Sequence, residues 1–556
     1  MTPVEVSPTP TPSVTGSLTP SPTDTGPTPA PTPTEQPSTP PGTATPTPTV
    51  TVTTTVTAEP STMTAAAPTV TTTTQTWVTA PASSSSQLPW GLVLSAALVL
   101  VVGLAATVWL ARRYRPTPSP APAVPSSTPV RGLLGFLVQL GRGMLDASTP
   151  AGQVNRDLLE VARVNGAPRA EIVSLPTALF VSLPDGGTAQ TVAVSAGRRP
   201  LRLDQVQAVL EVAQEAQERV IDPDEGSRRL TAALAAPEPY PLWLRVVGYA
   251  AVSAGLSLLL GGGWPDLAVA VVLGVAVALA LQLTTSATSG YAALVALGAA
   301  FAVSTLVFLL ARTGWPLVPL AALVPPLVTF LPGALLTTAA IDLATNQMVA
   351  GAARLASGGM QLVLLALGIT AGAGLVGVPA SLSASGSSPI GVFAPWLGVL
   401  LFGAGVGWHN GARRGSRRWI LLVLVVAYAG QVLGGLVFGG VVSAFVGALA
   451  MTPVAAVVST RPTGPPAMVS FLPGFWLLVP GALGLVGVTS VLGRSLDAAL
   501  GTVVTAAVTM VSICLGVLVG LAVSTPLVRR LRAAPRATAG PDLDAGDLDG
   551  PTPAGS

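Results

Sequence analysis

Long apolar segments fill the second half of the chain, from Trp243 to Val528. A helix needs roughly 20 apolar residues to cross the hydrocarbon layer of a membrane. Ten segments in this part approach or exceed that length: 246–261, 264–283, 291–311, 316–339, 348–376, 392–408, 419–438, 441–459, 468–490 and 500–523. A further charge-free apolar run occupies 90–110. The pattern therefore predicts about eleven transmembrane helices.

Between the first predicted span and the others, polar and apolar positions are mixed as in a water-soluble domain. Apolar residues at helical spacing over 132–148 predict a helix whose buried face carries Leu133, Leu137, Leu140 and Met144. A second helix is predicted over 149–166, with Thr149 as its N-cap and Pro150 at its first helical position.

Three short strands and two more helices complete this soluble region. The strands are predicted within 170–183, 186–197 and 199–203, around the turn signal at 184–187. The amphipathic helices are predicted at 204–220 and 223–236. The region is therefore expected to be a small α+β domain.

The first 89 residues are dominated by Pro, Thr, Ser, Ala and Val. Such a segment cannot bury enough apolar surface to offset its chain entropy, which predicts a disordered tail. It could span a cell wall or carry O-linked sugars, or it could be an inert extension. The predicted organisation is a tail (1–89), a first transmembrane helix (90–111), a cytosolic α+β domain (112–240), two five-helix transmembrane repeats (241–380 and 381–528) and a disordered tail (529–556).

Composition narrows the chemistry. Only 9% of the 556 residues are charged and half are hydrophobic, whereas soluble proteins carry about 25% charged residues. His409 and Cys514 are the only residues of their types, which excludes a zinc cluster, a disulfide scaffold, a Cys/His nucleophile pair and a Ser-His-Asp triad. A net charge of +3 is too small to suggest nucleic-acid binding. We expect no catalytic residue, metal or cofactor.

The arginines give an orientation, because cytoplasmic loops of membrane proteins are enriched in basic residues. Arg112, Arg113 and Arg115 follow the first span directly, while the preceding tail has no arginine. With the soluble domain inside, the inner loops would hold most of the remaining arginines and the outer loops only Arg312 and Arg494. The chain is therefore expected to be a multi-pass cell-membrane protein with an extracellular N-terminal tail and a cytoplasmic soluble domain and C-terminus.

A short motif occurs twice in the apolar region. Phe-Leu-Pro-Gly stands at 330–333 and again at 471–474, each time after a Pro-Pro pair and within the fourth of five apolar segments. Two homologous halves with an odd number of spans must be inserted in opposite orientations, as in many secondary transporters. In such folds, broken helices at matching places form the substrate site. The predicted substrate-binding residues are Pro332, Gly333, Pro473 and Gly474, the alternative being simple proline kinks.

Few charged residues lie in the apolar region, and each is informative because a charge at membrane depth is costly. Asp342 and Asn346 would share a face if their segment is helical, and Arg354 follows. Asp342, Asn346 and Arg354 are predicted to bind the substrate, with Asp342 and Arg354 binding the two charges of an amino acid and Asp342 also coupling to protons. The alternative is that they lie in a cytosolic connection. Asp266 opens a span, where it could couple to protons or cap the helix.

Three stretches resemble the threonine/serine exporter family. The first comprises "LLGFLVQLGRGMLDASTPAGQVNRDLLEVARVNG" and the strand ending Phe180-Val181-Ser182-Leu183. The second, "LVPPLVTFLPGALLTTAAIDLATNQMVAGAARL", is similar to the family's Pro-rich span with its Asp-Leu and Gly-x-x-Arg-Leu elements. The third is "RPTGPPAMVSFLPGFWLLVPGALGLVG". The 89-residue tail with its span, and Thr149-Pro150 in place of Gly and Ala, depart from the family pattern.

The resemblance implies export of L-threonine and L-serine from the cytoplasm, driven by the proton motive force through about ten spans. The implied partners are a small amino acid, protons and membrane lipid, with no nucleic acid; homo-oligomerisation stays open. The resemblance implies a transporter and not an enzyme. The alternative is a membrane-anchored sensor or wall-interaction protein without transport.

Overall fold

The structure is a computed structural model, and it describes residues 129–185, 188–197, 199–284, 292–377, 390–438, 440–478 and 496–533. The predicted N-terminal tail, the first transmembrane helix at 90–111 and residues 534–556 lie outside this range.

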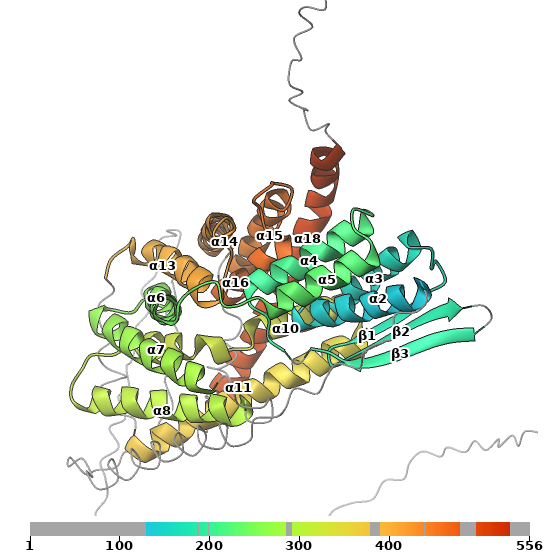
Figure 1. Cartoon of the computed structure of the whole chain (residues 1–556). Coiled ribbons are helices and arrows are strands. Elements are labelled where there is room, and N and C mark those ends of the chain that lie inside the picture. Colours follow the sequence, from blue (N-terminus) through green and yellow to red (C-terminus); the bar gives the residue numbers. More distant parts are fainter. Residues whose placement is uncertain are drawn as a thin grey trace, which may run out of the picture. The chain divides into compact units, whose positions relative to one another are not determined.

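From residue 129 on, the described part of the soluble region contains four helices and one antiparallel sheet (Figure 1). In chain order its elements are α2 (Pro129–Asp146), α3 (Ala151–Val164), β1 (Glu171–Leu175), β2 (Ala178–Asp185), β3 (Thr188–Ser195), α4 (Leu203–Gln217) and α5 (Pro223–Ala235). The strands lie in the order β1-β2-β3. Asp185, within the predicted turn signal at 184–187, pairs with Thr188 of β3.

The core of this region forms where apolar periodicity predicted it. Leu137, Leu140 and Met144 on α2 are completely buried, and they belong to the same core as Val181 and Leu183 of β2. The two helices predicted after the sheet are α4 and α5. The strand predicted at 199–203 is wrong, because this segment is irregular and Leu203 already begins α4.

The apolar region is mainly helical, as predicted. Its elements are α6 (Leu242–Leu259), α7 (Trp264–Thr284), α8 (Ala292–Arg312), α9 (Pro319–Leu323), the 3-10 helix η2 (Pro325–Phe330), α10 (Gly333–Ala344), α11 (Met348–Val376), α13 (Ala394–His409), α14 (Arg417–Phe438), α15 (Gly440–Val458), α16 (Ala467–Leu477) and α18 (Leu496–Ala533).

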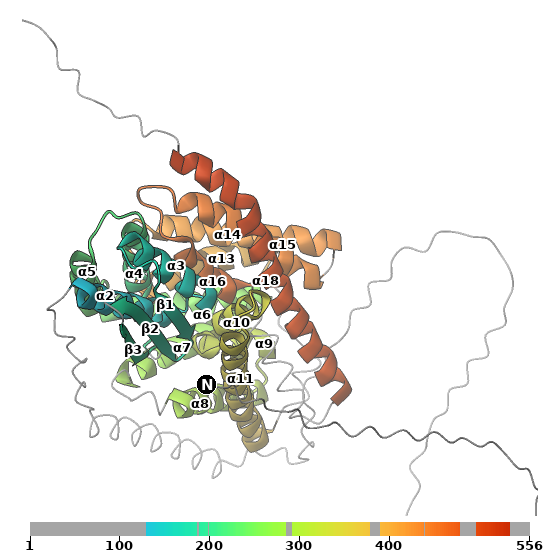
Figure 2. The same ribbon diagram turned by 90° about the vertical axis from the view of Figure 1, so that its right-hand side faces the viewer.

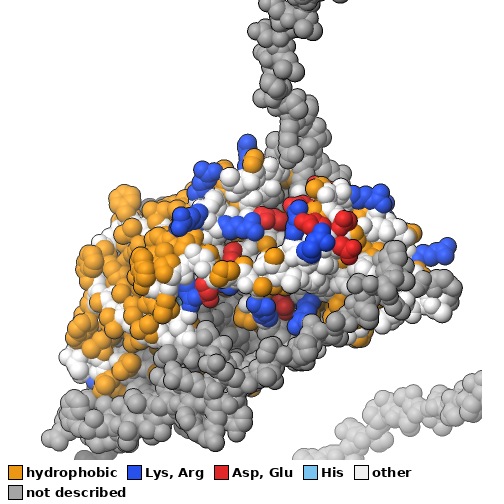
Figure 3. Space-filling view, viewed as in Figure 1, with side chains coloured by type: hydrophobic (Ala, Val, Ile, Leu, Met, Phe, Trp, Pro, Cys, Tyr) orange, Lys and Arg blue, Asp and Glu red, His pale blue; other side chains and the backbone are white. Residues whose placement is uncertain are grey.

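Six helices in the described part of the chain are long and apolar enough to cross a membrane: α6, α7, α8, α11, α14 and α18. Among the described residues, α10 and α16 are clearly shorter, and the predicted count of about eleven spans is not confirmed. Figure 3 shows hydrophobic side chains over α6, α7 and α13, whereas charged side chains gather over α2–α5. This contrast is the one expected between a membrane-embedded part and a water-exposed part.

The fourth apolar segment, 316–339, is not one continuous helix. It divides into α9, η2 and the start of α10, with prolines at 325, 326 and 332. Side chains of neighbouring helices bind the carbonyl groups at this break: Tyr249 donates to Pro326 O at 2.9 Å, and Gln361 donates to Phe330 O at 2.7 Å. Backbone polar groups shielded from water need such partners. These two hydrogen bonds therefore stabilise the break in the helix.

Helices α6 and α13 pack through glycines at very short distance. A methyl group added to Gly255 would lie 2.5 Å from the carbonyl oxygen of Gly398, and one added to Gly405 would lie 2.4 Å from that of Gly248. The later glycine of α6 thus meets the earlier one of α13, so the helices run antiparallel. Small residues let helix backbones approach this closely in membranes.

This seam gives a first prediction. Replacing Gly255 by Leu forces a side chain against the Gly398 carbonyl, and we expect a loss of about 3 kcal/mol of folded-state stability, since overpacking a rigid contact is costly. The matched control is Gly298→Leu in α8, where no atom lies within 4 Å of the added methyl group. Thermal unfolding in detergent measures both. Equal melting temperatures for the two variants would show that the seam is loosely packed.

Candidate functional site

Asp342 and Arg354 form a buried ion pair. Asp342 lies in the last turn of α10 and Arg354 near the start of α11. The Arg354 Nη1 atom is 2.6 Å from Asp342 Oδ2, and the side chains are 4% and 0% exposed. A buried pair of this kind is stable only when further hydrogen bonds satisfy both groups.

Those further hydrogen bonds come from the soluble domain. The backbone N–H of Ala151, at the first position of α3, donates to Asp342 Oδ1 at 2.9 Å. Arg354 Nη2 donates to the carbonyl oxygen of Thr149 at 2.9 Å. Because a carboxylate at a helix N-terminus is favoured by the helix dipole, Asp342 serves α3 as a cap supplied from another part of the chain.

Asp342 therefore takes the place predicted for Thr149. The N-cap position of α3 is Pro150, and no side chain of α3 itself closes that end. The Thr149 hydroxyl is completely buried and has no hydrogen-bond partner among the described residues. The prediction that Thr149 caps this helix is wrong, since the carboxylate of Asp342 already binds the free N–H group.

Two tight turns bring the α2–α3 connection and the α10–α11 connection together. Ser148 and Asn346 end α2 and α10 in the left-handed conformation, with φ of 60° and 61°. In each turn the next residue donates back to the helix: Thr149 N to Met144 O, and Gln347 N to Asp342 O. This is the Schellman pattern of helix ends.

The Asn346 side chain does not share a face with Asp342, as a continuous helix would require. Helix α10 ends at Ala344, and Asn346 is an exposed residue in the turn that follows. Asparagine suits this turn because its short polar side chain tolerates a positive φ.

The two Pro-Gly motifs meet. Pro332 and Gly333 begin α10, whereas Pro473 and Gly474 lie within α16. A methyl group added to Gly333 would lie 3.5 Å from the carbonyl oxygen of Phe475, directly after the second motif. Gly333 and Asp342 are at opposite ends of α10, about 13 Å apart along the helix axis.

Asp266 is completely buried at the start of α7. Its two carboxylate oxygens accept the backbone N–H groups of Gly263, at 2.9 Å, and Val318, at 2.7 Å. It thus closes the N-terminus of α7 and holds the entry to α9. This geometry favours capping, one of the two roles that the sequence left open.

A cavity of about 330 Å³ lies between the soluble domain and the apolar helices. On the soluble side it is lined by α3 and α4, through Gln153, Arg156, Asp157, Gln214 and Gln217. On the opposite side α10, α16 and α18 contribute apolar residues that include Ile341, Phe471, Phe475, Val517 and Leu521. Figure 2 shows α3, α10 and α16 beside one another at this place. The volume suits a small ligand.

Asp157 is the titratable carboxyl group in this cavity. Burial raises its pKa, while a hydrogen bond from Gln153 and the positive charge of Arg156 act in the opposite direction. The Gln153 amide is 3.4 Å from Asp157 Oδ2. Sequence reasoning missed this cavity, because polar residues on one face of α3 and α4 look like an ordinary solvated surface.

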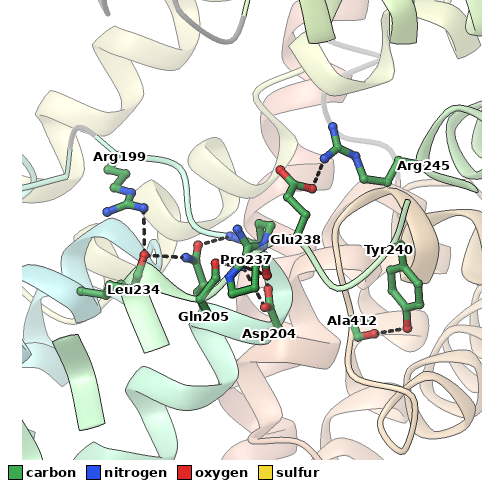
Figure 4. Close-up of polar contacts among 11 residues, drawn as sticks. Arg199, Asp204, Gln205, Leu234, Pro237, Glu238, Tyr240, Arg245 and Ala412 are labelled. Carbon is green, nitrogen blue, oxygen red and sulfur yellow. Dashed lines mark hydrogen bonds and ion pairs between the residues drawn. The ribbon is translucent and has the colours of Figure 1, made fainter. Parts of the chain in front are cut away.

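The soluble domain also contacts the connection between α13 and α14. Ser416 donates to Gln207 of α4 at 2.8 Å, and Arg413 pairs with Glu211 at 2.7 Å. Figure 4 shows the segment that leads into α6, where Tyr240 donates to the carbonyl oxygen of Ala412 and Glu238 pairs with Arg245. The domain is thus attached at several separate points.

The ion pair gives a second prediction. Asp342→Asn leaves Arg354 buried without its counter-charge, and the loss should be on the order of 3 kcal/mol of folded-state stability. The double variant Asp342→Asn with Arg354→Gln should lose less than the sum of the two single variants, since neither charge is then stranded. Thermal unfolding in detergent measures this coupling.

The control is the exposed pair between Glu160 and Arg163, whose side chains are 41% and 63% exposed. Its removal should change stability by less than about 1 kcal/mol. Additive losses at Asp342 and Arg354 would mean that their charges do not interact in solution.

Comparison with known proteins bears on the soluble domain and the first group of apolar helices. No curated protein and no solved structure matches the chain. Residues 135–376 match the family model described as "Putative threonine/serine exporter". The matched residues run from α2 through α11 and include the ion pair. The third resembling stretch, 461–487, lies beyond the matched residues. Over residues 135–376, the chain is similar to the threonine/serine exporter family.

Proposed function

We propose that this protein is a secondary-active transporter that exports L-threonine and L-serine from the cytoplasm. The observation that carries the proposal is the family match over 135–376, because it includes most of the soluble domain together with α10 and α11, which carry the buried ion pair. Six apolar helices of membrane-crossing length support a multi-pass membrane protein. The cavity between the two parts supports a small-molecule substrate.

The two groups of apolar helices would act as inverted halves. Helices α6 and α13 are the first members of the two groups, and they pack antiparallel through reciprocal glycines. Such pairing is expected of halves related by a twofold axis in the membrane plane. Few side chains interlock where α6 and α13 pack through glycines. One half of the apolar region could therefore rotate relative to the other about this contact.

Substrate would bind where the two Pro-Gly motifs meet. Helix α10 begins at Gly333, beside Phe475 of α16, so its N-terminal N–H groups and positive dipole end face the second half. The carboxylate of an amino acid is the group that such an interrupted helix binds in transporters. Pro332, Gly333, Pro473 and Gly474 are the residues assigned to this site.

Asp342 and Arg354 would act as a latch between the soluble domain and the transport path. Protonation of Asp342 would remove the charge that holds Arg354 and the N-terminus of α3. The α2–α3 turn would then loosen at the edge of the cavity, where Pro150 forms part of the wall. This step is how we propose that the proton motive force couples to transport.

The third prediction tests transport directly. Purified protein in liposomes preloaded with unlabelled L-threonine should accumulate labelled L-threonine and L-serine by counterflow, and protein-free liposomes should not. Absence of counterflow for both amino acids would contradict the proposed function and would favour the sensor or wall-interaction alternative.

Proton coupling needs a separate readout. With a pH gradient imposed, uphill transport of L-threonine should occur and a protonophore should abolish it. Counterflow that persists while uphill transport ignores the gradient would leave the exporter assignment in place and remove the coupling.

A further inference from the structure

The cavity between the soluble domain and the apolar helices has two chemically different sides. Its charged and amide side chains come from α3 and α4 of the soluble domain, and the facing helices contribute mainly aliphatic and aromatic groups. A solute held there would therefore be recognised by the soluble domain. We propose that Arg156 and Asp157, with the neighbouring glutamines, form an entry site that selects a zwitterionic amino acid before it reaches the Pro-Gly motifs.

This inference rests on the proposed export function and deepens it. An α-amino acid carries a carboxylate and an ammonium group on one carbon, so it needs a cation and an anion close together. Arg156 and Asp157 are adjacent on α3, and both line the cavity. Within the described residues, neither forms an ion pair with a side chain of opposite charge at 4 Å or less. Both charges are thus available to a ligand.

Within the described residues, Asp157 accepts no hydrogen bond from a cationic side chain. The neutral amides of Gln153 and Gln217 and the charge of Arg156 favour its ionised form, yet burial raises its pKa above the ordinary carboxyl value. An ammonium group would supply the counter-charge that these amides lack, and a charge-assisted hydrogen bond is stronger than a neutral one. The side-chain amides of Gln214 and Gln217 also line the cavity, where they could bind the substrate hydroxyl group.

The apolar side of the cavity connects the entry site with the Pro-Gly motifs. Phe471 and Phe475 both line the cavity, and the Phe475 carbonyl oxygen is close to Gly333. At about 330 Å³ the cavity is near the lower limit of ligand pockets, roughly 300 Å³, which favours small amino acids. A solute leaving Arg156 and Asp157 would therefore move along α16 toward α10.

The chain offers a matched control on the same helix. Glu160 and Arg163 lie one turn further along α3, form an exposed ion pair, and do not line the cavity. They carry the same charges on the same element. A loss of function caused merely by changing the charge of α3 would appear in both pairs.

The fourth prediction compares Arg156→Gln and Asp157→Asn with Glu160→Gln and Arg163→Gln, in the full-length chain in liposomes. The first two variants should raise the half-saturating L-threonine concentration for counterflow by about tenfold, the effect of losing one charge-assisted contact. The maximal rate should change less than twofold. The two control variants should match wild type, and Arg156→Lys should restore part of the affinity.

Substrate analogues distinguish the two roles. Threonine amide lacks the carboxylate and N-acetylthreonine lacks the ammonium group, so both should compete weakly with L-threonine in wild type. Arg156→Gln should lose discrimination against the amide, and Asp157→Asn should lose discrimination against the N-acetyl compound. Asp157→Asn should unfold at or above the wild-type temperature, because it removes a carboxylate whose ionised form burial disfavours.

The outcomes separate this inference from the proposed function. One outcome is that Arg156→Gln and Asp157→Asn show the same half-saturating concentration and the same analogue selectivity as the wild-type protein. This result would overturn the entry site and leave the proposed function in place. Equal losses in the control pair would overturn it too, since they would trace the effect to the charge of the helix. Wild type without counterflow would overturn the proposed function itself.

Discussion

One buried ion pair joins the α2–α3 turn of the soluble domain to the apolar region. Asp342 and Arg354 come from the apolar region, yet the groups that satisfy them belong to the α2–α3 turn of the soluble domain. A buried ion pair is stable only where further hydrogen bonds satisfy both charged groups. The α2–α3 turn supplies those hydrogen bonds, and the ion pair in return holds the turn. The wall of the neighbouring cavity follows from this contact, because Pro150 lies in the same turn and faces that space.

The spacing of apolar residues predicted the helices well where an element buries one face and exposes the other. The buried leucines of α2 and the two helices after the sheet are examples, and the doubled Pro-Gly motif pointed to the interruption before α10. The segment 199–203 failed because its alternating pattern is too short to distinguish a strand from an irregular entry to α4. Asn346 lies outside the helix that carries Asp342, because asparagine can stop a helix as readily as continue one exposed face. Its predicted part in substrate binding stays a prediction.

The site was predictable only in its charged residues. Asp342 and Arg354 stand out in an apolar sequence, but nothing local reveals that their partners lie about 200 residues earlier. Arg156 and Asp157 are harder to recognise, since a charged face on an amphipathic helix normally meets water. Tertiary packing against α16 and α18 gives that face its cavity, and no pattern within α3 encodes the neighbour.

The capping of α3 by Asp342 has a consequence for how the protein is made. The ribosome releases residues 151–164 long before Asp342, 191 positions later than Ala151, has been synthesised. Until α10 has been made and has packed against the soluble domain, the first turn of α3 has no carboxylate to close it. The hydrogen bonding at the start of α3 is therefore completed only after the chain has been extended through α10.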